Sequence, residues 1–482
     1  MNIKDKQEII ELKKIINEKD RYINDLKNST SWRITYPIRF LFDFIKFVFK
    51  ILNKIFCLIK NYGFSEFIKI LNTKIIKKFT YFKTALPLLI FKYKKGDIFH
   101  KGKQSIFVDC SYVYENPEMN TGIQRVVKNI LRNSNKYSKD KNINIIPIHI
   151  LDNCILAVSL EKNKKRNLFN LYKNIIVPQK NDIFLMLDSS CWNNNIWDQI
   201  KRIKYSGAVI IGVTYDLIPI LYPQFVVDDL SKVFCNFYSF ALKYFDGFIA
   251  ISDTVKNDLI NYIKLQNLDK NKYKFDHFVL GADLKKNIFN EENIRSSVKT
   301  MFDSSPVYLI VSTIEPRKNH QLLLDVFDKL WFENLDVKLC IVGRIGWKVE
   351  ELIQRIKKHK RFNKKLFMFN DLNDDELIFC YKKSKSLVFP SFTEGFGLPI
   401  VESLYFGLPV LASDIPIHRE IGSDLIDYFN LDNENDLLVK IKNDLLVKRD
   451  INVKNIQVFS WEQSAYQLFD KTIDIFNNYC QR

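Results

Sequence analysis

Two successive series of short apolar runs, separated by helical stretches, constrain this chain most. The first series begins near Ser105 and the second near Val307, and a polar segment, "NEENIRSSVKT", lies between them. Apolar runs that alternate with helices are typical of parallel sheets covered on both faces. We therefore predict an α/β fold with two parallel-sheet domains that face each other. Ligands should bind beyond the carboxyl ends of the strands, in a cleft between the domains.

The individual runs give the expected elements. The first series predicts strands at "IFVDCS", "INIIPIHI", "DIFLMLD", "AVIIGVTYD", "GFIAIS" and "KFDHFVL". The second series predicts strands at "VYLIVST", "VKLCIVG", "LFMFND", "SLVFPS" and "PVLASD". Helices are predicted at "IQRVVKNILR", "TVKNDLINYIK" and "SWEQSAYQLFDKTIDIFNNY".

The chain divides into five predicted segments. Its 482 residues are too many for one ordinary hydrophobic core. The predicted segments are a helix over 1–28, a basic amphipathic segment over 29–103, a Rossmann-like domain over 104–300, a second Rossmann-like domain over 301–460, and a closing helix over 461–482.

The first segment, 1–28, has apolar side chains at three- and four-residue spacing, from Ile9 to Leu26. This spacing predicts a helix. Two interpretations stay open: a short coiled coil that would join copies of the chain into a homo-oligomer, or a solvated amphipathic helix.

Basic charge is concentrated in the second segment. From Arg33 to Lys103 there are 16 Lys and Arg against three acids, which is 13 of the chain's net charge of +18. Charged residues recur among Phe, Ile and Leu from Asp43 to Lys54, so this stretch is a poor membrane-spanning helix. It is typical of a helix that lies on an anionic membrane surface. The alternative is a basic helix packed on the protein's own core. Because the segment is apolar and rich in lysine, we predict no nucleic-acid partner.

Cysteine usage and the N-terminus predict the compartment. The eight cysteines form no CxxC pair, which argues against a zinc site or a disulfide framework. The N-terminus is charged and has no apolar signal-peptide core. We therefore expect a cytoplasmic protein, held peripherally on the inner face of the cytoplasmic membrane by the segment 29–103.

The stretch "PSFTEGFGLPIVESLYFGLPVLASD" carries the clearest chemical pattern. Gly395 and Gly397 follow a predicted strand and precede a helix, so their N–H groups could bind an anion such as a diphosphate. Glu394 precedes this turn, and Glu402 lies about one turn into the helix, where it could accept hydrogen bonds from hydroxyl groups. A purely structural turn would explain the glycines and Pro399, but not both acids.

"EGFGLPIVE" resembles the E-x7-E motif of the retaining family 4 (group 1) glycosyltransferases, which have the GT-B fold. Four further stretches resemble this family in the expected order: "NTGIQRVVKNIL", "VTYDLIPILYP", "AISDTVKNDL" and "VSTIEPRKNHQLLLDVF". Together the matches extend from about Phe107 to Glu420. The stretch "SWRITYPIR" is similar to a linker in some bacterial glycan-assembly glycosyltransferases.

The resemblance implies a catalytic set. Glu394 matches the first motif glutamate, which lies by the donor sugar and the reacting centre. Arg317 and Lys318 match the basic pair that neutralises the diphosphate, whose charge grows as the glycosidic bond breaks. Without the resemblance, "PRKN" would be a solvated loop. The resemblance implies no metal and no cofactor.

The resemblance also implies a donor-binding set. Glu402 matches the glutamate that binds the ribose hydroxyls of the nucleotide, and Gly122 matches a loop glycine near the phosphates and the acceptor. Arg125 is expected to be a helix-surface or salt-bridge residue. The backbone expected to contact the donor sugar and phosphate belongs to Gly395, Phe396, Gly397 and Leu398.

The sequence departs from the family's pattern in the first domain. Many members carry His before the aspartate of the "VTYD" stretch, whereas Tyr215 stands here before Asp216. Tyr215, Asp216 and Ser252 are candidate sugar or acceptor contacts, and Asp216 could instead cap a turn. "VSTIE" also lacks the Arg that many members have, which leaves more of the phosphate charge to Arg317 and Lys318.

The resemblance implies transfer of a sugar, with retention, from a nucleoside diphosphate sugar to a glycan acceptor in cell-surface polysaccharide synthesis. The membrane-facing segment indicates a lipid-linked acceptor. The alternative is a catalytically inactive GT-B protein that acts as a membrane-associated assembly scaffold.

Overall fold

The computed structural model describes residues 104–119, 121–152, 154–158, 175–189, 191, 196–283, 289–447 and 458–480. All of these residues belong to one compact unit of the chain. The predicted helix over 1–28 and the predicted membrane-facing segment over 29–103 lie outside them, so both stay predictions.

No helix in the described part of the chain combines the length and the apolar character that crossing a bilayer requires.

The first sheet contains eight strands within the described residues. Six of them pair in parallel, and two short strands at one edge pair antiparallel. In order across the sheet they are β4 (Ile175–Ile176), β3 (Ile155–Ala157), β2 (Asn144–Ile150), β1 (Ser105–Asp109), β5 (Ile183–Met186), β6 (Val209–Thr214), β7 (Gly247–Ala250) and β8 (Lys274–His277).

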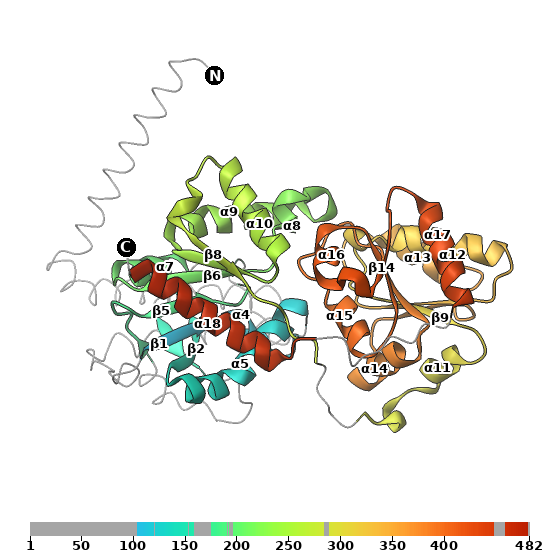
Figure 1. Ribbon diagram of the computed structural model, residues 1–482, viewed down its shortest axis with the longest axis horizontal. Helices are drawn as coiled ribbons and strands as arrows, with labels where there is room; N and C mark the ends of the chain where they lie inside the picture. Colours follow the sequence, from blue (N-terminus) through green and yellow to red (C-terminus); the bar gives the residue numbers. More distant parts are fainter. Residues whose placement is uncertain are drawn as a thin grey trace, which may run out of the picture. The chain divides into compact units, whose positions relative to one another are not determined.

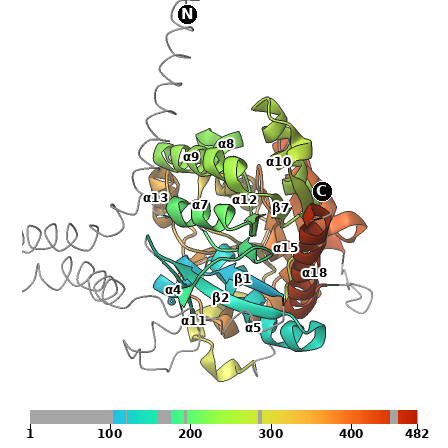
Figure 2. The ribbon, with the colours of Figure 1, turned by 90° about the vertical axis from the view of Figure 1, so that its left-hand side faces the viewer.

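Helices from both ends of the described chain pack on this sheet, and together they form the first lobe. They are α4 (Ser111–Glu115), α5 (Gly122–Lys141), α7 (Trp197–Tyr205), α8 (Ile218–Leu221), α9 (Asp228–Tyr244), α10 (Asp253–Leu265) and α18 (Trp461–Cys480). The last helix, α18, packs beside α5, where the Tyr137 hydroxyl donates to Asp470 at 2.8 Å (Figures 1 and 2).

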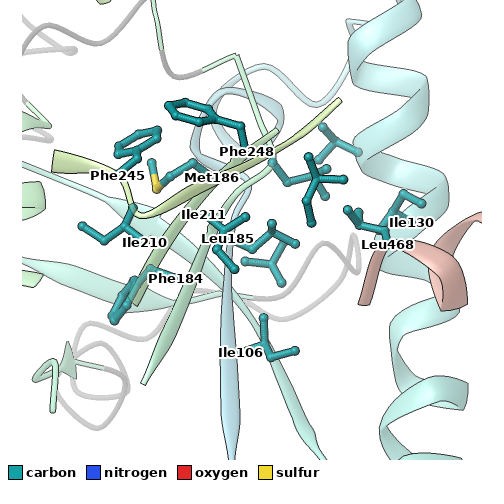
Figure 3. Packing of buried hydrophobic residues seen from close by; sticks show 14 of the residues in the cluster. Ile106, Ile130, Phe184, Leu185, Met186, Ile210, Ile211, Phe245, Phe248 and Leu468 are labelled. Carbon is teal, nitrogen blue, oxygen red and sulfur yellow. The ribbon is translucent and has the colours of Figure 1, made fainter. Parts of the chain in front are cut away.

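The core of the first lobe is built from strands that are buried on both faces. Phe184, Leu185, Ile210 and Ile211 are fully buried in β5 and β6. Figure 3 shows these side chains together with Ile130 of α5 and Leu468 of α18, from the same apolar cluster. Burial on both faces explains why the strands read as nearly continuous apolar runs in the sequence.

The second sheet contains six strands within the described residues, and all of them pair in parallel. In order they are β11 (Leu366–Phe369), β10 (Lys338–Val342), β9 (Val307–Val311), β12 (Ser386–Phe389), β13 (Val410–Ser413) and β14 (Asp427–Phe429).

Alternate side chains of these strands enter two different apolar clusters, as the two-residue period of a strand requires. In β9, Tyr308 and Ile310 enter one cluster and Leu309 enters the other. The first cluster includes side chains from α12 (His320–Phe332), α13 (Glu350–Lys358) and α17 (Glu434–Leu446). The second includes side chains from α11 (Ser296–Lys299), α14 (Asp374–Lys383) and α15 (Leu398–Tyr405). With α16 (Pro416–Gly422), these elements form the second lobe (Figure 1).

The predicted α/β fold with two parallel-sheet domains is confirmed. Every strand predicted from an apolar run is present, and the predicted helices correspond to α5, α10 and α18. The sequence prediction missed β3, β4 and β14, which have two or three residues each and so give no periodic signal. The exact domain boundaries stay predictions.

The chain leaves the first lobe next to the point where it returns. Ala282 donates its N–H to the carbonyl of Phe459 at 3.0 Å, and the Trp461 N–H donates to Asp283 at 2.5 Å. A Cβ on Gly281 would collide with the backbone of Ser460 and Trp461, so only glycine allows this close approach.

Candidate active site

The loop between β12 and α15 places the "EGFGLP" residues at the carboxyl end of the second sheet. Gly397 has φ of +99°, a conformation that glycine adopts without strain, and it precedes the first residue of α15. A Cβ on Gly395 would collide with the carbonyl of Tyr215 in the first lobe. Gly395 therefore lets this loop lie directly against the end of β6.

Glu394 is buried and paired with two cations. Arg317 donates from Nη1 to one oxygen of Glu394 at 2.8 Å, and Lys318 donates from Nζ to the other oxygen. The cations come from a 3-10 turn, Pro316–Lys318, shortly after β9. Because β9 and β12 are neighbours in the sheet, their carboxyl ends bring these groups together.

Two further acids complete this charged cluster. Nε of Arg317 lies 2.6 Å from an oxygen of Glu315, and Asp216 of the first lobe interacts electrostatically with Arg317. When all five groups are ionised, three negative charges face two positive ones. The two cations predicted for the diphosphate are thus already balanced by protein carboxylates.

The pKa values follow from burial and from this charge balance. Burial alone would raise the pKa of Glu394, but Arg317 and Lys318 outweigh it and hold the pKa well below its ordinary range. Burial raises the pKa of Asp216 and of Glu315, and Arg317 offsets only part of that shift. Burial, followed by repulsion from Arg317, lowers the pKa of Lys318.

Tyr215, Asp216 and Ser252 all lie where the first lobe meets the glycine loop. Asp216 accepts from the N–H of Ile218 at 3.1 Å, so it does cap its own turn while facing the charged cluster. The Tyr215 hydroxyl donates to the carbonyl of Leu187 at 2.7 Å. Ser252 is buried, caps α10, and donates to the carbonyl of Gly395 at 2.9 Å.

Glu402 lies apart from this cluster and has different partners. The side chain is 1% exposed, and one oxygen accepts from Nη2 of Arg125 at 2.5 Å. The other oxygen accepts from the Tyr381 hydroxyl at 2.7 Å. Burial, followed by the Glu402 charge, raises the pKa of Tyr381 well above its ordinary value, so the phenol remains a donor.

The remaining predicted residues divide into open and packed positions. Among the described residues, and apart from the chain neighbours of Gly122 and the backbone of its own helix, no heavy atom lies within 4 Å of the position of a Cβ on Gly122, at the start of α5. Phe396 is buried in the apolar cluster of the first lobe, and Leu398 packs against the same cluster. Any ligand contact from Phe396 and Leu398 is therefore expected from the backbone, as the family resemblance of this stretch implied.

Sequence reasoning missed Tyr381 and Glu315, and it gave Arg125 no role beyond a surface or salt-bridge residue. A signal for Arg125 was present, because it lies one helical turn from Gly122. Glu315 lies two residues before Arg317 in the sequence, whereas nothing in the sequence around Tyr381 points to Glu402.

Comparison with known proteins finds a family match for the second lobe. Residues 291–450 match the family described as "Glycosyl transferases group 1". These residues form a group 1 glycosyltransferase domain. Arg317, Lys318, Glu394 and Glu402 lie within the glycosyltransferase domain, whereas Arg125 lies outside it.

Two curated relatives extend the likeness. The chain is 31% identical over 301 residues to the serotype-specific mannosyltransferase WbdA of Escherichia coli, which is 60% of this chain and 37% of WbdA. It is 26% identical over 254 residues to the O-antigen chain mannosyltransferase RfbU of Salmonella typhimurium, which is 50% of this chain and 66% of RfbU. The chain thus spans little more than a third of WbdA.

A solved structure supports the fold. The crystal structure of a glycosyltransferase from Rickettsia africae superimposes with a TM-score of 0.51 at 18% identity, and the match covers 78% of this chain and all of that one. The predicted resemblance to group 1 glycosyltransferases of the surface-polysaccharide type, with its two-lobed fold, is confirmed.

Among the described residues, no group of three or more His, Cys, Asp or Glu side chains is arranged to hold a metal ion. Metal independence stays a prediction.

Proposed function

We propose that this protein is a retaining, metal-independent glycosyltransferase that moves a sugar from a nucleoside diphosphate sugar to a glycan acceptor in surface-polysaccharide synthesis. The supporting observation is the buried Glu394 carboxylate, which Arg317 and Lys318 hold ionised at the carboxyl end of the second sheet. A fixed negative charge there can stabilise positive charge that develops on the donor sugar. Retention rests on the resemblance of the "EGFGLPIVE" stretch.

Arg317 and Lys318 would also act on the leaving diphosphate. A guanidinium has five N–H donors and an ammonium has three, so both cations keep donors beyond those used on carboxylates. Because the five-group cluster carries no surplus positive charge, an entering diphosphate must share these cations with Glu394 and Glu315. N–H groups of the glycine loop and the start of α15 would supply further donors.

The names of the relatives indicate mannose as the first sugar to test. WbdA and RfbU are described as mannosyltransferases.

The experiment is to incubate the purified protein with a panel of nucleotide sugars that includes GDP-mannose, and to measure donor hydrolysis and transfer. We expect turnover with one donor, no loss of rate with a chelator, and a product with the donor's anomeric configuration. A folded protein that binds and cleaves no donor would instead support the scaffold alternative, and an inverted product would exclude retention.

The acceptor and the location are part of the same proposal. We propose that residues 29–103 attach the protein to the cytoplasmic face of the membrane, near a lipid-linked acceptor, and that residues 1–28 join copies of the chain. Deleting residues 1–103 should abolish co-sedimentation with anionic vesicles and preserve donor binding, because every predicted site residue follows residue 103. Equal sedimentation of both proteins would exclude the membrane role.

A further inference from the structure

Arg125 holds the carboxylate of Glu402 from the opposite lobe. It lies in the first turn of α5, three residues after Gly122, whereas Glu402 lies in α15. The Arg125 side chain is 24% exposed, and the Glu402 side chain is 1% exposed. In the described part of the chain, Arg125 is the cation paired with Glu402. The Glu402 charge in turn raises the pKa of Arg125.

The hydrogen-bond capacity of Glu402 is only partly used. An ionised carboxylate has about four acceptor sites on its two oxygens. Arg125 occupies one on the first oxygen, and Tyr381 occupies one on the second. About two sites remain, one on each oxygen. Two vicinal hydroxyls, such as those of a ribose, match this number of remaining acceptor sites.

A buried carboxylate can accept those bonds only if its two oxygens are held in the right orientation. Tyr381 fixes the position of one oxygen but carries no positive charge. Arg125 brings a positive charge to the carboxylate, and its hydrogen bond fixes the second oxygen.

We propose that Arg125 is a positioning residue for the nucleotide: it pairs with Glu402 across the lobes and orients the carboxylate so that it accepts both ribose hydroxyls. This proposal rests on the proposed function, since it assumes that Glu402 binds the donor's ribose. Because the two residues belong to different lobes, ribose binding then depends on contact between α5 and α15.

The experiment measures the affinity of nucleoside diphosphates for the full-length protein by calorimetry. ADP, CDP, GDP and UDP are compared first, and the tightest binder is then compared with its 2′,3′-dideoxy counterpart. The variants are Arg125→Ala, Arg125→Lys, Glu402→Gln and the double variant Arg125→Ala/Glu402→Gln. The matched control is Arg132→Ala, because Arg132 is an exposed arginine of the same helix that contacts Asn129.

We expect Arg125→Ala to weaken the ribose nucleotide by about 10-fold, the effect of one hydrogen bond involving a charged group. The dideoxy nucleotide should bind the wild type and Arg125→Ala equally. Arg125→Lys should recover part of the loss, the double variant should bind no more weakly than Glu402→Gln, and Arg132→Ala should match the wild type.

Three outcomes would overturn the proposal. Equal weakening of the ribose and dideoxy nucleotides would show that Arg125 contacts another part of the nucleotide or supports the fold. Additive losses in the double variant would show that Arg125 does not act through Glu402. An unchanged affinity in Arg125→Ala would exclude any role in binding. If the wild type binds none of the four nucleotides, the proposed function and this proposal both fail, whereas tight but ribose-insensitive binding contradicts only the latter. Melting temperatures of all variants identify any that do not fold.

Discussion

Glu394 and Glu402 are buried glutamates eight positions apart, and their surroundings differ in origin. Glu394 is held by Arg317 and Lys318, two adjacent residues of its own lobe. Glu402 is held by Arg125, which is 277 residues away in the sequence and belongs to the other lobe. The first carboxylate faces two cations and two further acids, whereas the second faces one cation and a phenol.

This difference separates two tasks. The cluster around Glu394 is complete within the second lobe except for Asp216, so it can exist before the lobes meet. The surroundings of Glu402 are complete only when α5 contacts α15. The charge proposed to act in the chemistry is thus built within one lobe, whereas the group proposed to recognise the ribose depends on the contact between lobes.

The largest expected effect is on stability, at Glu394. Glu394→Gln leaves Arg317 and Lys318 facing a neutral side chain, and breaking a buried ion pair in this way costs about 3–5 kcal/mol. Thermal and denaturant unfolding at pH 7 measure the loss. Glu351→Gln, at an exposed glutamate of α13, is the control and should match the wild type.

The lowered pKa of Glu394 also predicts how this loss of stability depends on pH. The folded-state pKa of Glu394 lies below its ordinary value, so the stability it contributes is present above the pKa of an unfolded glutamate, about 4. That stability is lost as the pH falls further. The difference in free energy of unfolding between the wild type and Glu394→Gln should therefore become smaller below about pH 4. A difference that stays constant down to about pH 3 would contradict the lowered pKa.

The next largest effect is on turnover, at Arg317 and Lys318. The proposed attraction of these cations to the diphosphate should grow as the glycosidic bond breaks, so each Ala variant should lower kcat by about 10²-fold. Lys318→Arg should not restore the rate, because a planar fork cannot replace a compact ammonium in a buried position. Steady-state kinetics measure both, with Lys329→Ala of α12 as the control. A loss confined to KM would mean that these cations only bind the donor.

The family resemblance placed Glu394, Arg317 and Lys318 in one catalytic set, whereas it assigned no protein partner to Glu402. Arg317, Lys318 and Glu394 follow neighbouring parallel strands, and the carboxyl ends of such strands meet, so the pattern of the chain brings these residues together. The partners of Glu402 depend on how two lobes pack, which no periodicity encodes. The same limit applies to Gly395, whose role against Tyr215 is visible only once both lobes are in place.

The third effect is on donor affinity, at Glu402. Glu402→Ala removes the acceptor proposed for the ribose and should lower kcat/KM by about 1–3 kcal/mol. The proposed ribose contact should be equally strong in the ground state and in the transition state. Most of the change should therefore appear in KM rather than in kcat. Donor titration of the folded variant is the measurement. An unchanged dissociation constant would remove the ribose assignment and would leave the pairing with Arg125 as a contact between lobes.

The smallest effect tests whether any side chain that bridges the two lobes would affect nucleotide affinity. Glu420 of α16 also reaches the first lobe, where it accepts from the N–H groups of Asp253 and Thr254 at 2.7 and 2.8 Å, at the start of α10. It is exposed, and losing such a cap costs about 1 kcal/mol. Glu420→Ala should therefore lower the free energy of unfolding by that amount and leave nucleotide affinity unchanged. If it weakens the nucleotide as much as Arg125→Ala does, the effect of Arg125 reflects lobe contact in general, and the contrast between the two glutamates loses its basis.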